Sequence, residues 1–416
     1  MSSAALEGKR ICIVHPHTIA TDVRLDKTVL MLTNAGAKVT IACIADTNKD
    51  VGDLENIARI WRIKRGPRLS AFSEHSNWYA RVFFNKIIAG PLRYLQGKLH
   101  ANDPLHGMAK SLSEKQYDAV HFINYTSSRE AIRLRRLSPV PIIYESYECW
   151  PKALADLQKE QRVPWNHFAL WRKREISCAK VANAIITVSK PIQETYKKFS
   201  PKACHLTIYN VALAAPLQPA PIHSPLRFYL QSFLRQHYGI ESALRAFARV
   251  DKDYELTIQG PSYVPGYLER LKQLVSELKL DDRVTFASPC KNEDSVAAAN
   301  DHDVGFLFLP SRIDGAENYN GKWSLPNKLF VYASAGLAMM YSTYQETTRN
   351  LLNGSESALF VDGNDEAAIA CSIEDLVENP DKVTCMKNAS YNWAQGYTIK
   401  TEGAKLTEMY QSILSV

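Results

Sequence analysis

A short stretch in the second half of the chain has residue types that suit the binding of an anion. Residues 324–340 read SLPNKLFVYASAGLAMM, in which Ser324 fits the N-cap of a helix and Pro326 fits its first turn. A helix N-terminus exposes unpaired backbone N–H groups and a partial positive charge, and Lys328 adds a full charge one turn further on. The pattern predicts a phosphate site. The alternative is a capped core helix with a solvated lysine.

The elements that must position this helix follow a regular alternation of strands and helices. In the first half, strands are predicted at residues 10–14, 38–45, 119–123, 141–144 and 184–188, with helices at 22–35, 127–137, 165–182 and 191–199. In the second half, strands are predicted at 226–230, 254–259, 283–287, 304–309 and 338–342, and further helices at 241–250, 266–278, 293–299, 365–378 and 401–414. Such alternation predicts parallel sheets with right-handed crossovers.

The two halves are separated by a proline-rich run that cannot continue a helix or a central strand, and 416 residues exceed one ordinary core. We therefore predict an α/β fold of two doubly wound Rossmann-like domains facing across a cleft. Residues 1–210 form the first domain, 211–225 the linker and 226–397 the second domain, and a C-terminal helix at 398–416 packs back on the first. Ligands of such sheets bind at the carboxyl ends of the strands.

Composition places the chain among soluble globular proteins, with 46% hydrophobic and 22% charged residues. No apolar run reaches the roughly 18 residues that a membrane span needs, and residues 1–9 are too polar for a signal peptide, so we expect a cytoplasmic protein. The eight cysteines are scattered singly, without a Cys-x-x-Cys pair or a histidine at metal spacing. That pattern predicts reduced, mostly buried thiols and excludes a zinc or disulfide scaffold.

The net charge of +7 is concentrated between residues 59 and 98, which hold nine basic residues and the single acid Glu74. The same segment is rich in aromatics, and residues 77–95 are compatible with an amphipathic helix capped by Ser76. Two interpretations explain basic and aromatic residues in one segment equally well. The segment binds an anionic membrane surface, or its aromatic side chains pack on the domain core and its charges face solvent. No nucleic-acid recognition fold accompanies the charge, so we predict no nucleic-acid partner.

Residues 326–337, PNKLFVYASAGL, resemble the PNKLFEY…AGLP segment of bacterial retaining glycosyltransferases of the GT-B fold, in the large family 4 and its relatives. Other family-like motifs follow in matching order over most of the chain. They are TDVR at 21–24, DAVH at 118–121, YESYE at 144–148, AIITVS at 184–189, IQG at 258–260, DRVTF at 282–286 and DVG at 303–305.

The resemblance implies that this helix faces the diphosphate and ribose of a nucleotide-sugar donor. Lys328 is the first candidate for the diphosphate, and Arg235 or His237 is the second, because Gln231 stands where the family has a glycine. Ser324 and Asn327 would add donors at the helix start.

The family has a ribose-gripping glutamate where this chain has Val331. Such a carboxylate contributes bonds of roughly 1.5–3 kcal/mol each, so a neighbour must compensate or the donor must bind differently. We expect Tyr332 or Glu317 to substitute for it.

In the first half, the resemblance implies three catalytic candidates, His121, Asp22 and Glu148. It places His121 beside the transferred sugar, Asp22 and Arg24 as orienting groups, and Glu148 on the acceptor hydroxyl, with Tyr147 where the family has histidine. The alternatives are a histidine satisfied at a strand end, an aspartate favoured in the first turn of a helix, and a surface-loop glutamate.

The resemblance implies a reaction that moves a sugar from a nucleotide-sugar to an acceptor hydroxyl with retention of configuration. The implied acceptor is a glycan or a lipid-linked molecule at the inner membrane face. The implied setting is the assembly of bacterial envelope polysaccharide or lipopolysaccharide. The leaving phosphate then helps to deprotonate the acceptor. The chain has no Asp-x-Asp pair in the expected position, so we predict no metal and no cofactor. A 2-epimerase acting on nucleotide-sugars and a degenerate, non-catalytic binding protein remain as alternatives, the latter because of Val331, Gln231 and Tyr147.

Substitution of Val331 by glutamate tests how the ribose position is filled. We expect Val331→Glu to leave donor affinity unchanged or to improve it, because it restores the residue type that the family uses there. Calorimetric titration of nucleotides into both proteins measures the effect. A large loss of affinity would show that an apolar contact is needed at this position.

Overall fold

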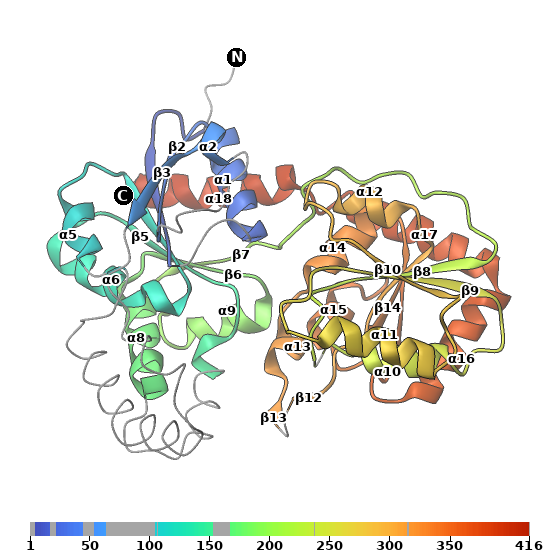
Figure 1. Cartoon of the computed structure of the whole chain (residues 1–416). Helices are drawn as coiled ribbons and strands as arrows, with labels where there is room; N and C mark the ends of the chain where they lie inside the picture. The colour runs from blue at the N-terminus through green and yellow to red at the C-terminus, as the bar shows by residue number, and fades with distance from the viewer. Residues whose placement is uncertain are drawn as a thin grey trace, which may run out of the picture. The chain divides into compact units, whose positions relative to one another are not determined.

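The computed structural model describes residues 5–16, 22–44, 54–63, 105, 107–152, 167–236, 238–313 and 316–415. The chain divides into two compact units (Figure 1). Unit 1 comprises Met1–Ile208 together with Gly403–Val416, and unit 2 comprises Tyr209–Glu402. Most of the basic segment, including the amphipathic helix predicted at residues 77–95, lies outside the described residues.

Unit 1 is built on a parallel sheet in the order β3-β2-β1-β4-β5-β6-β7. The strands are β1 (Arg10–His15), β2 (Lys38–Ile44), β3 (Arg59–Ile63), β4 (Ala119–Ile123), β5 (Ile142–Ser146), β6 (Ala184–Thr187) and β7 (Cys204–Thr207). The helices are α1 (Val23–Asn34), α2 (Leu54–Ile57), α5 (Met108–Ser113), α6 (Asn124–Leu137), α8 (His167–Val181) and α9 (Lys190–Lys197). The last helix, α18 (Ile399–Leu414), starts in unit 2, and its residues from Gly403 onward belong to unit 1.

Unit 2 repeats the pattern with a parallel sheet in the order β10-β9-β8-β11-β14-β15. The strands are β8 (Leu226–Gln231), β9 (Tyr254–Gln259), β10 (Val284–Ala287), β11 (Val304–Leu307), β14 (Ala338–Ser342) and β15 (Ala358–Val361), and a small hairpin is formed by β12 (Arg312–Ile313) and β13 (Ala316–Glu317). The helices are α10 (Ile240–Phe247), α11 (Tyr267–Glu277), α12 (Ser295–Asn300), α13 (Tyr319–Trp323), α14 (Asn327–Ser334), α15 (Glu346–Leu351), α16 (Glu366–Glu378) and α17 (Pro380–Ala394).

In each sheet the strand order reverses beside the first strand, between β1 and β4 in unit 1 and between β8 and β11 in unit 2. This reversal is the mark of the doubly wound fold, and it confirms the predicted fold class for both units. It also identifies the carboxyl edge at each reversal as the place where a ligand fits best, because the loops diverge there.

The linker residues 211–225 contain no regular element and are bonded to the rest of unit 2. The backbone N–H of Leu217 donates to the Ser334 carbonyl at 2.7 Å, and His223 Nδ1 lies 3.2 Å from the carboxylate of Asp303. Asp303 is fully buried and also accepts from Lys387 Nζ at 2.8 Å. The proline-rich run is therefore attached to the second sheet at several points.

All eight cysteines are free, but only four of them, Cys12, Cys43, Cys149 and Cys178, are buried. The expectation of mostly buried thiols was wrong for the other four. Cys290 is half-buried, and Cys204, Cys371 and Cys385 are exposed. Among the residues that the structure describes, no helix has the length and apolar character to cross a membrane.

A buried carboxylate supports the core of unit 1. Glu175 on α8 is fully buried, and the hydroxyl of Tyr144 on β5 donates to it at 2.6 Å, with the Tyr196 hydroxyl of α9 as a second donor. Burial raises the pKa of Glu175 to about 7, and the two phenol donors offset only part of that rise.

Glu175→Gln is expected to make unfolding less dependent on pH. Because the folded pKa lies above the unfolded value, Glu175 favours the folded state below pH 4.5 and loses that contribution as the pH rises through about 7. This loss amounts to about 3 kcal/mol. Urea unfolding of both proteins between pH 4.5 and 8 measures it, with the exposed Glu277→Gln as control. A stability difference between Glu175→Gln and the parent that does not vary with pH would contradict the assignment.

Candidate functional site

A buried network of charged side chains lies where β4, β5 and α1 meet in unit 1. Its centre is Glu145 on β5, whose Oε1 accepts from Nε and Nη2 of Arg24 at 2.8 and 2.6 Å. The other oxygen, Oε2, lies 3.0 Å from Nε2 of His121 on β4. Burial by itself would raise the pKa of Glu145, but the Arg24 guanidinium and His121 more than compensate and lower it to about 2.

His121 lies inside this network, with 0% of its surface exposed. Its Nδ1 is 2.9 Å from the hydroxyl of Tyr410 on α18, whereas its Nε2 lies 3.0 Å from Glu145 Oε2 without the geometry of a hydrogen bond. In this structure His121 is therefore a buried histidine with a polar neighbour at each ring nitrogen and a hydrogen bond at one of them. Its role beside a transferred sugar stays a prediction.

Asp22 serves first as the N-cap of α1. Its Oδ1 accepts from the backbone N–H groups of Arg24 and Leu25 at 3.0 and 3.1 Å, and its Oδ2 lies 2.7 Å from Nε2 of His15 at the end of β1. Asp22 thus precedes the helix and is not in its first turn. The structure brings Asp22, Arg24 and His121 together around the same strand ends.

Tyr147 and Glu148 follow directly after β5. The backbone N–H of Tyr147 faces Oδ1 of Asn124 at 3.5 Å, and burial together with the charge of Asp22 raises the pKa of the Tyr147 phenol far above its ordinary value. Glu148 is half-buried, and its carbonyl accepts from Ser146 Oγ at 2.9 Å. Both residues are half-buried, and the Tyr147 phenol lies near the charge of Asp22.

In unit 2, α14 begins later than the sequence predicted. Its first residue is Asn327 and its N-cap is Pro326, while Ser324 is extended and closes α13. The prediction of Ser324 as the N-cap was wrong, and its buried hydroxyl has no hydrogen-bond partner. Proline fits the cap because its fixed φ suits the helix entry, but it supplies no side-chain acceptor. Asn327 accepts at Oδ1 from the side-chain amide of Asn210 in the linker.

Two cations of unit 2 gather at one aromatic ring. Lys328 Nζ lies 5.7 Å from the ring centroid of Tyr238, and the guanidinium carbon of Arg235 lies 4.5 Å from the same centroid, with Nη2 donating to the Tyr238 hydroxyl at 2.6 Å. Within the described part of the chain, no carboxylate forms an ion pair with either side chain. We call Lys328 and Arg235 the cation pair. Burial, followed by the charge of Arg235, lowers the pKa of Lys328 to about 8.

The position at which the resemblance implies a ribose contact is apolar, and the expected substitution by Tyr332 was wrong. Val331 is 7% exposed, and Tyr332 is fully buried. The Tyr332 hydroxyl accepts from the backbone N–H of Gln231 at 2.9 Å and faces the Phe306 carbonyl at 3.4 Å. It is committed to the sheet and has no access to a ligand.

Glu317 and Gln231 have local partners of their own. Glu317 is exposed and lies 3.4 Å from both Lys322 Nζ and the Tyr344 hydroxyl. The side-chain amide of Gln231, at the end of β8, donates to Sγ of Cys290 at 3.4 Å. The structure thus brings Lys328 and Arg235 together, while Glu317 contacts other side chains.

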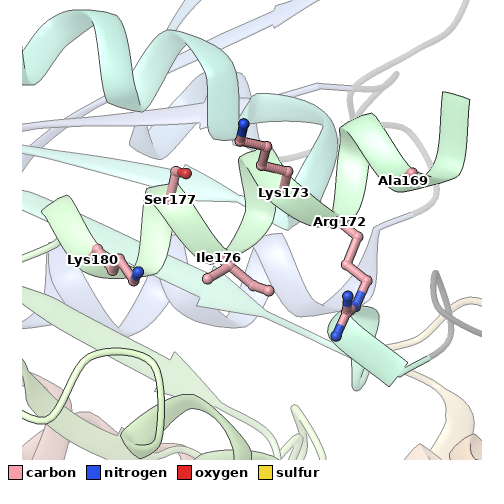
Figure 2. A pocket seen from close by; sticks show the side chains of 6 residues that line it. All are labelled: Ala169, Arg172, Lys173, Ile176, Ser177 and Lys180. Carbon is pink, nitrogen blue, oxygen red and sulfur yellow. The ribbon is translucent and has the colours of Figure 1, made fainter.

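A cavity of about 350 Å³ lies along the outer side of α8 (Figure 2). Its lining comes entirely from this helix and comprises Ala169, Arg172, Lys173, Ile176, Ser177 and Lys180, none of which is a predicted site residue. The described ranges contain no group of three metal-ligating side chains, and the expectation that the protein uses no metal stays a prediction.

Several solved structures share this architecture over nearly their whole length. Sucrose-phosphate synthase from Thermosynechococcus elongatus matches with 15% identity and a TM-score of 0.70, covering 98% of this chain and 99% of that one. HepE from Anabaena, in complex with UDP and glucose, matches with 13% identity and a TM-score of 0.68, covering 97% of this chain and 100% of that one. The lipopolysaccharide outer core galactosyltransferase WaaB matches with 13% identity and a TM-score of 0.62, covering 97% of this chain and 99% of that one.

The chain has the GT-B fold. At these identities the likeness concerns the fold alone, and no protein-family model and no curated protein sequence matches the chain. The GT-B fold nevertheless agrees with the doubly wound sheets of both units.

Four residues of these clusters were missed from the sequence. Glu145 stands in the YESYE motif, where Glu148 was preferred, and Tyr410 is 289 residues away from His121. Tyr238 was not singled out in the loop that contains Arg235. Asn124 has a φ of 59°, in the left-handed region that asparagine tolerates better than most residues. An asparagine directly after a predicted strand was the available signal.

Arg235→Gln is expected to raise the pKa of Lys328 above about 8, because it removes the neighbouring positive charge while burial remains. NMR titration of ¹³C-labelled lysines measures this value, with the resonance assigned by its loss in Lys328→Gln. Arg249→Gln is the matched control, because Arg249 is exposed and paired with Glu366. An unchanged Lys328 pKa in Arg235→Gln would show that the two charges do not interact.

Proposed function

We propose that the protein is a glycosyltransferase that moves a sugar from a nucleotide-sugar donor to an acceptor hydroxyl with retention of configuration. The observation that carries this proposal is the cation pair. Arg235 follows β8, and Lys328 lies in the first turn of α14, which lies between β11 and β14. Both cations therefore flank the point where the strand order of unit 2 reverses, which is the preferred ligand position in a doubly wound sheet.

The charges of this pair explain why an anion would bind. Two like charges near one ring repel each other, and the pKa of Lys328 is lowered first by burial and then by the charge of Arg235. A diphosphate would supply the missing negative charge and accept charge-assisted hydrogen bonds from both side chains. The backbone N–H groups at the start of α14 would add neutral donors beside Lys328.

The solved structures support the donor class. HepE from Anabaena has been crystallised with UDP, with UDP-glucose, and with UDP and glucose, in the same fold. We therefore propose a hexosyl-type nucleotide-sugar donor held by unit 2. The leaving phosphate would help to deprotonate the acceptor, so that positioning and phosphate stabilisation supply most of the rate without a metal ion or another cofactor.

The setting we propose is the assembly of bacterial envelope polysaccharide or lipopolysaccharide on the cytoplasmic side of the membrane. The lipopolysaccharide galactosyltransferase WaaB has the same fold and supports this setting. Unit 1 would then bind the acceptor, and the basic segment at residues 59–98 would attach the protein to anionic lipid.

A degenerate, non-catalytic binding protein is the second candidate, and one observation favours it. The ribose position carries the buried Val331, and Tyr332 is bonded to the sheet, so neither supplies the acceptor oxygens that a ribose-gripping glutamate would. Slow hydrolysis of the donor separates the two candidates, because a working transferase transfers some sugar to water and a degenerate one does not.

Lys328→Gln tests the proposal. Loss of one or two charge-assisted bonds is expected to reduce kcat/KM for transfer or donor hydrolysis by ~100-fold and to abolish the thermal shift given by the best of UDP, GDP, ADP and CMP. Lys382→Gln is the control, because Lys382 is exposed and paired with Asp375 at 2.6 Å. Unchanged nucleotide binding and turnover in Lys328→Gln would refute the assigned site.

A further inference from the structure

Three half-buried aromatic side chains from separate segments of unit 1 form one cluster. Tyr125 lies in the first turn of α6, Trp150 follows β5, and Trp171 is on α8. The ring centroids of Tyr125 and Trp150 are 4.5 Å apart, and those of Tyr125 and Trp171 are 5.5 Å apart in an edge-to-face arrangement. Such distances are those of rings in direct packing contact. We call these three side chains the aromatic cluster.

Asn124 positions this cluster from the carboxyl end of β4. Its backbone has a φ of 59°, and its Oδ1 faces the Trp150 indole N–H at 3.3 Å and the Tyr147 backbone N–H at 3.5 Å. A left-handed non-glycine residue is unfavourable unless its surroundings hold it, and such residues gather at functional sites. Asn124 thus combines a left-handed backbone with a carboxamide that joins the end of β4 to the segment after β5.

The segment that carries Trp150 is attached at its other end as well. Nε of Arg172 on α8 donates to the Pro151 carbonyl at 3.0 Å, and the Trp150 backbone N–H donates to the Glu148 carbonyl at 2.9 Å. The guanidinium of Arg174 lies 5.1 Å from the Trp171 centroid and covers part of that ring. Trp150 is therefore the platform of the cluster, held in place before any ligand arrives, and Tyr125 and Trp171 support it.

A carboxylate borders the aromatic cluster. Glu148 is two residues before Trp150, and its carbonyl accepts from the Trp150 backbone N–H at 2.9 Å. Burial, followed by the negative charges of Glu148 and Glu175, raises the pKa of the Tyr125 phenol. Glu148 is half-buried, as the three rings are. The cluster therefore presents apolar ring surface with a phenol and a carboxylate close to it.

We propose that the aromatic cluster and Glu148 form the acceptor subsite and that the acceptor is a carbohydrate, one of whose rings packs on Trp150. This inference rests on the proposed function, because it identifies the acceptor class of that reaction. A sugar ring has an apolar C–H face and hydroxyl groups around its edge. The face would pack on the indole, and hydroxyls would bond to Glu148 and the Tyr125 phenol.

A lipid chain fits this surface less well, because it would leave the Glu148 carboxylate beside apolar groups without a hydrogen-bond partner from the ligand. A sugar uses both parts of the surface. The pre-formed position of Trp150 also favours a rigid ring, since neither partner then loses much conformational freedom on binding.

Saturation-transfer NMR with five soluble saccharides tests this subsite: glucose, galactose, mannose, N-acetylglucosamine and lactose. We expect saturable binding of at least one, with the strongest transfer to ring C–H protons. Trp150→Leu should weaken that binding about tenfold or more, and Trp150→Tyr should retain most of it. Asn124→Gly keeps the left-handed backbone but removes the carboxamide, so it should retain the melting temperature and weaken binding. Phe233→Leu, an exposed aromatic of unit 2, is the control.

The same proteins are titrated with UDP, GDP, ADP and CMP, so that the two proposals fail separately. Nucleotide binding without binding of any of the five saccharides would overturn the carbohydrate subsite and leave the donor assignment standing. Saccharide binding that is equal in Trp150→Leu and in the parent would also overturn it. Saccharide binding that depends on Trp150, without binding of any nucleotide, would support the subsite and refute the donor site.

Discussion

Both units depend on one topological constraint, the reversal of strand order beside the first strand of a parallel sheet. Between β1 and β4, and again between β8 and β11, neighbouring crossovers leave on opposite faces, and the loops at the carboxyl edge separate. Polar side chains collect at that edge because every strand end and every following helix start lies there. His15, Asp22 and Glu145 in unit 1, and Arg235 and Lys328 in unit 2, all follow this rule.

The two clusters of charge have opposite electrostatic states. In unit 1, Glu145 lies between Arg24 and His121, and its pKa of about 2 shows that these partners outweigh the cost of burial. In unit 2, Lys328 and Arg235 both lie near the ring of Tyr238, and no carboxylate of the described residues forms an ion pair with either. Unit 1 therefore has its balancing charge built in, whereas the proposed ligand of unit 2 would supply it.

The sequence predicted the fold better than the site. All ten predicted strands are present, because buried parallel strands are apolar runs that periodicity detects. The missed strands β3, β7 and β15 lie at sheet edges, where burial is less complete and the apolar pattern weaker. Side-chain partners were harder to predict: the Tyr410 hydroxyl reaches His121 across 289 residues, and the Tyr332 hydroxyl reaches the Gln231 backbone across 101. No local pattern contains such pairs, so neither contact was predicted.

Side chains with partners inside the fold differ from those without, and this difference indicates which residues of each unit suit ligand binding. A fully buried side chain such as His121 loses its contacts with Tyr410 and Glu145 if it turns to a ligand, and so it suits the positioning of its neighbours. A ligand gains the most binding free energy where it relieves a repulsion or covers apolar surface that the folded protein leaves partly exposed. In unit 2 that is the repulsion between Lys328 and Arg235, which favours an anion. In unit 1 it is the half-buried ring of Trp150 beside Glu148, which favours a ligand with an apolar face and a polar edge. The proposed donor and the proposed acceptor differ in these properties, so two sheets of the same topology would discriminate between them.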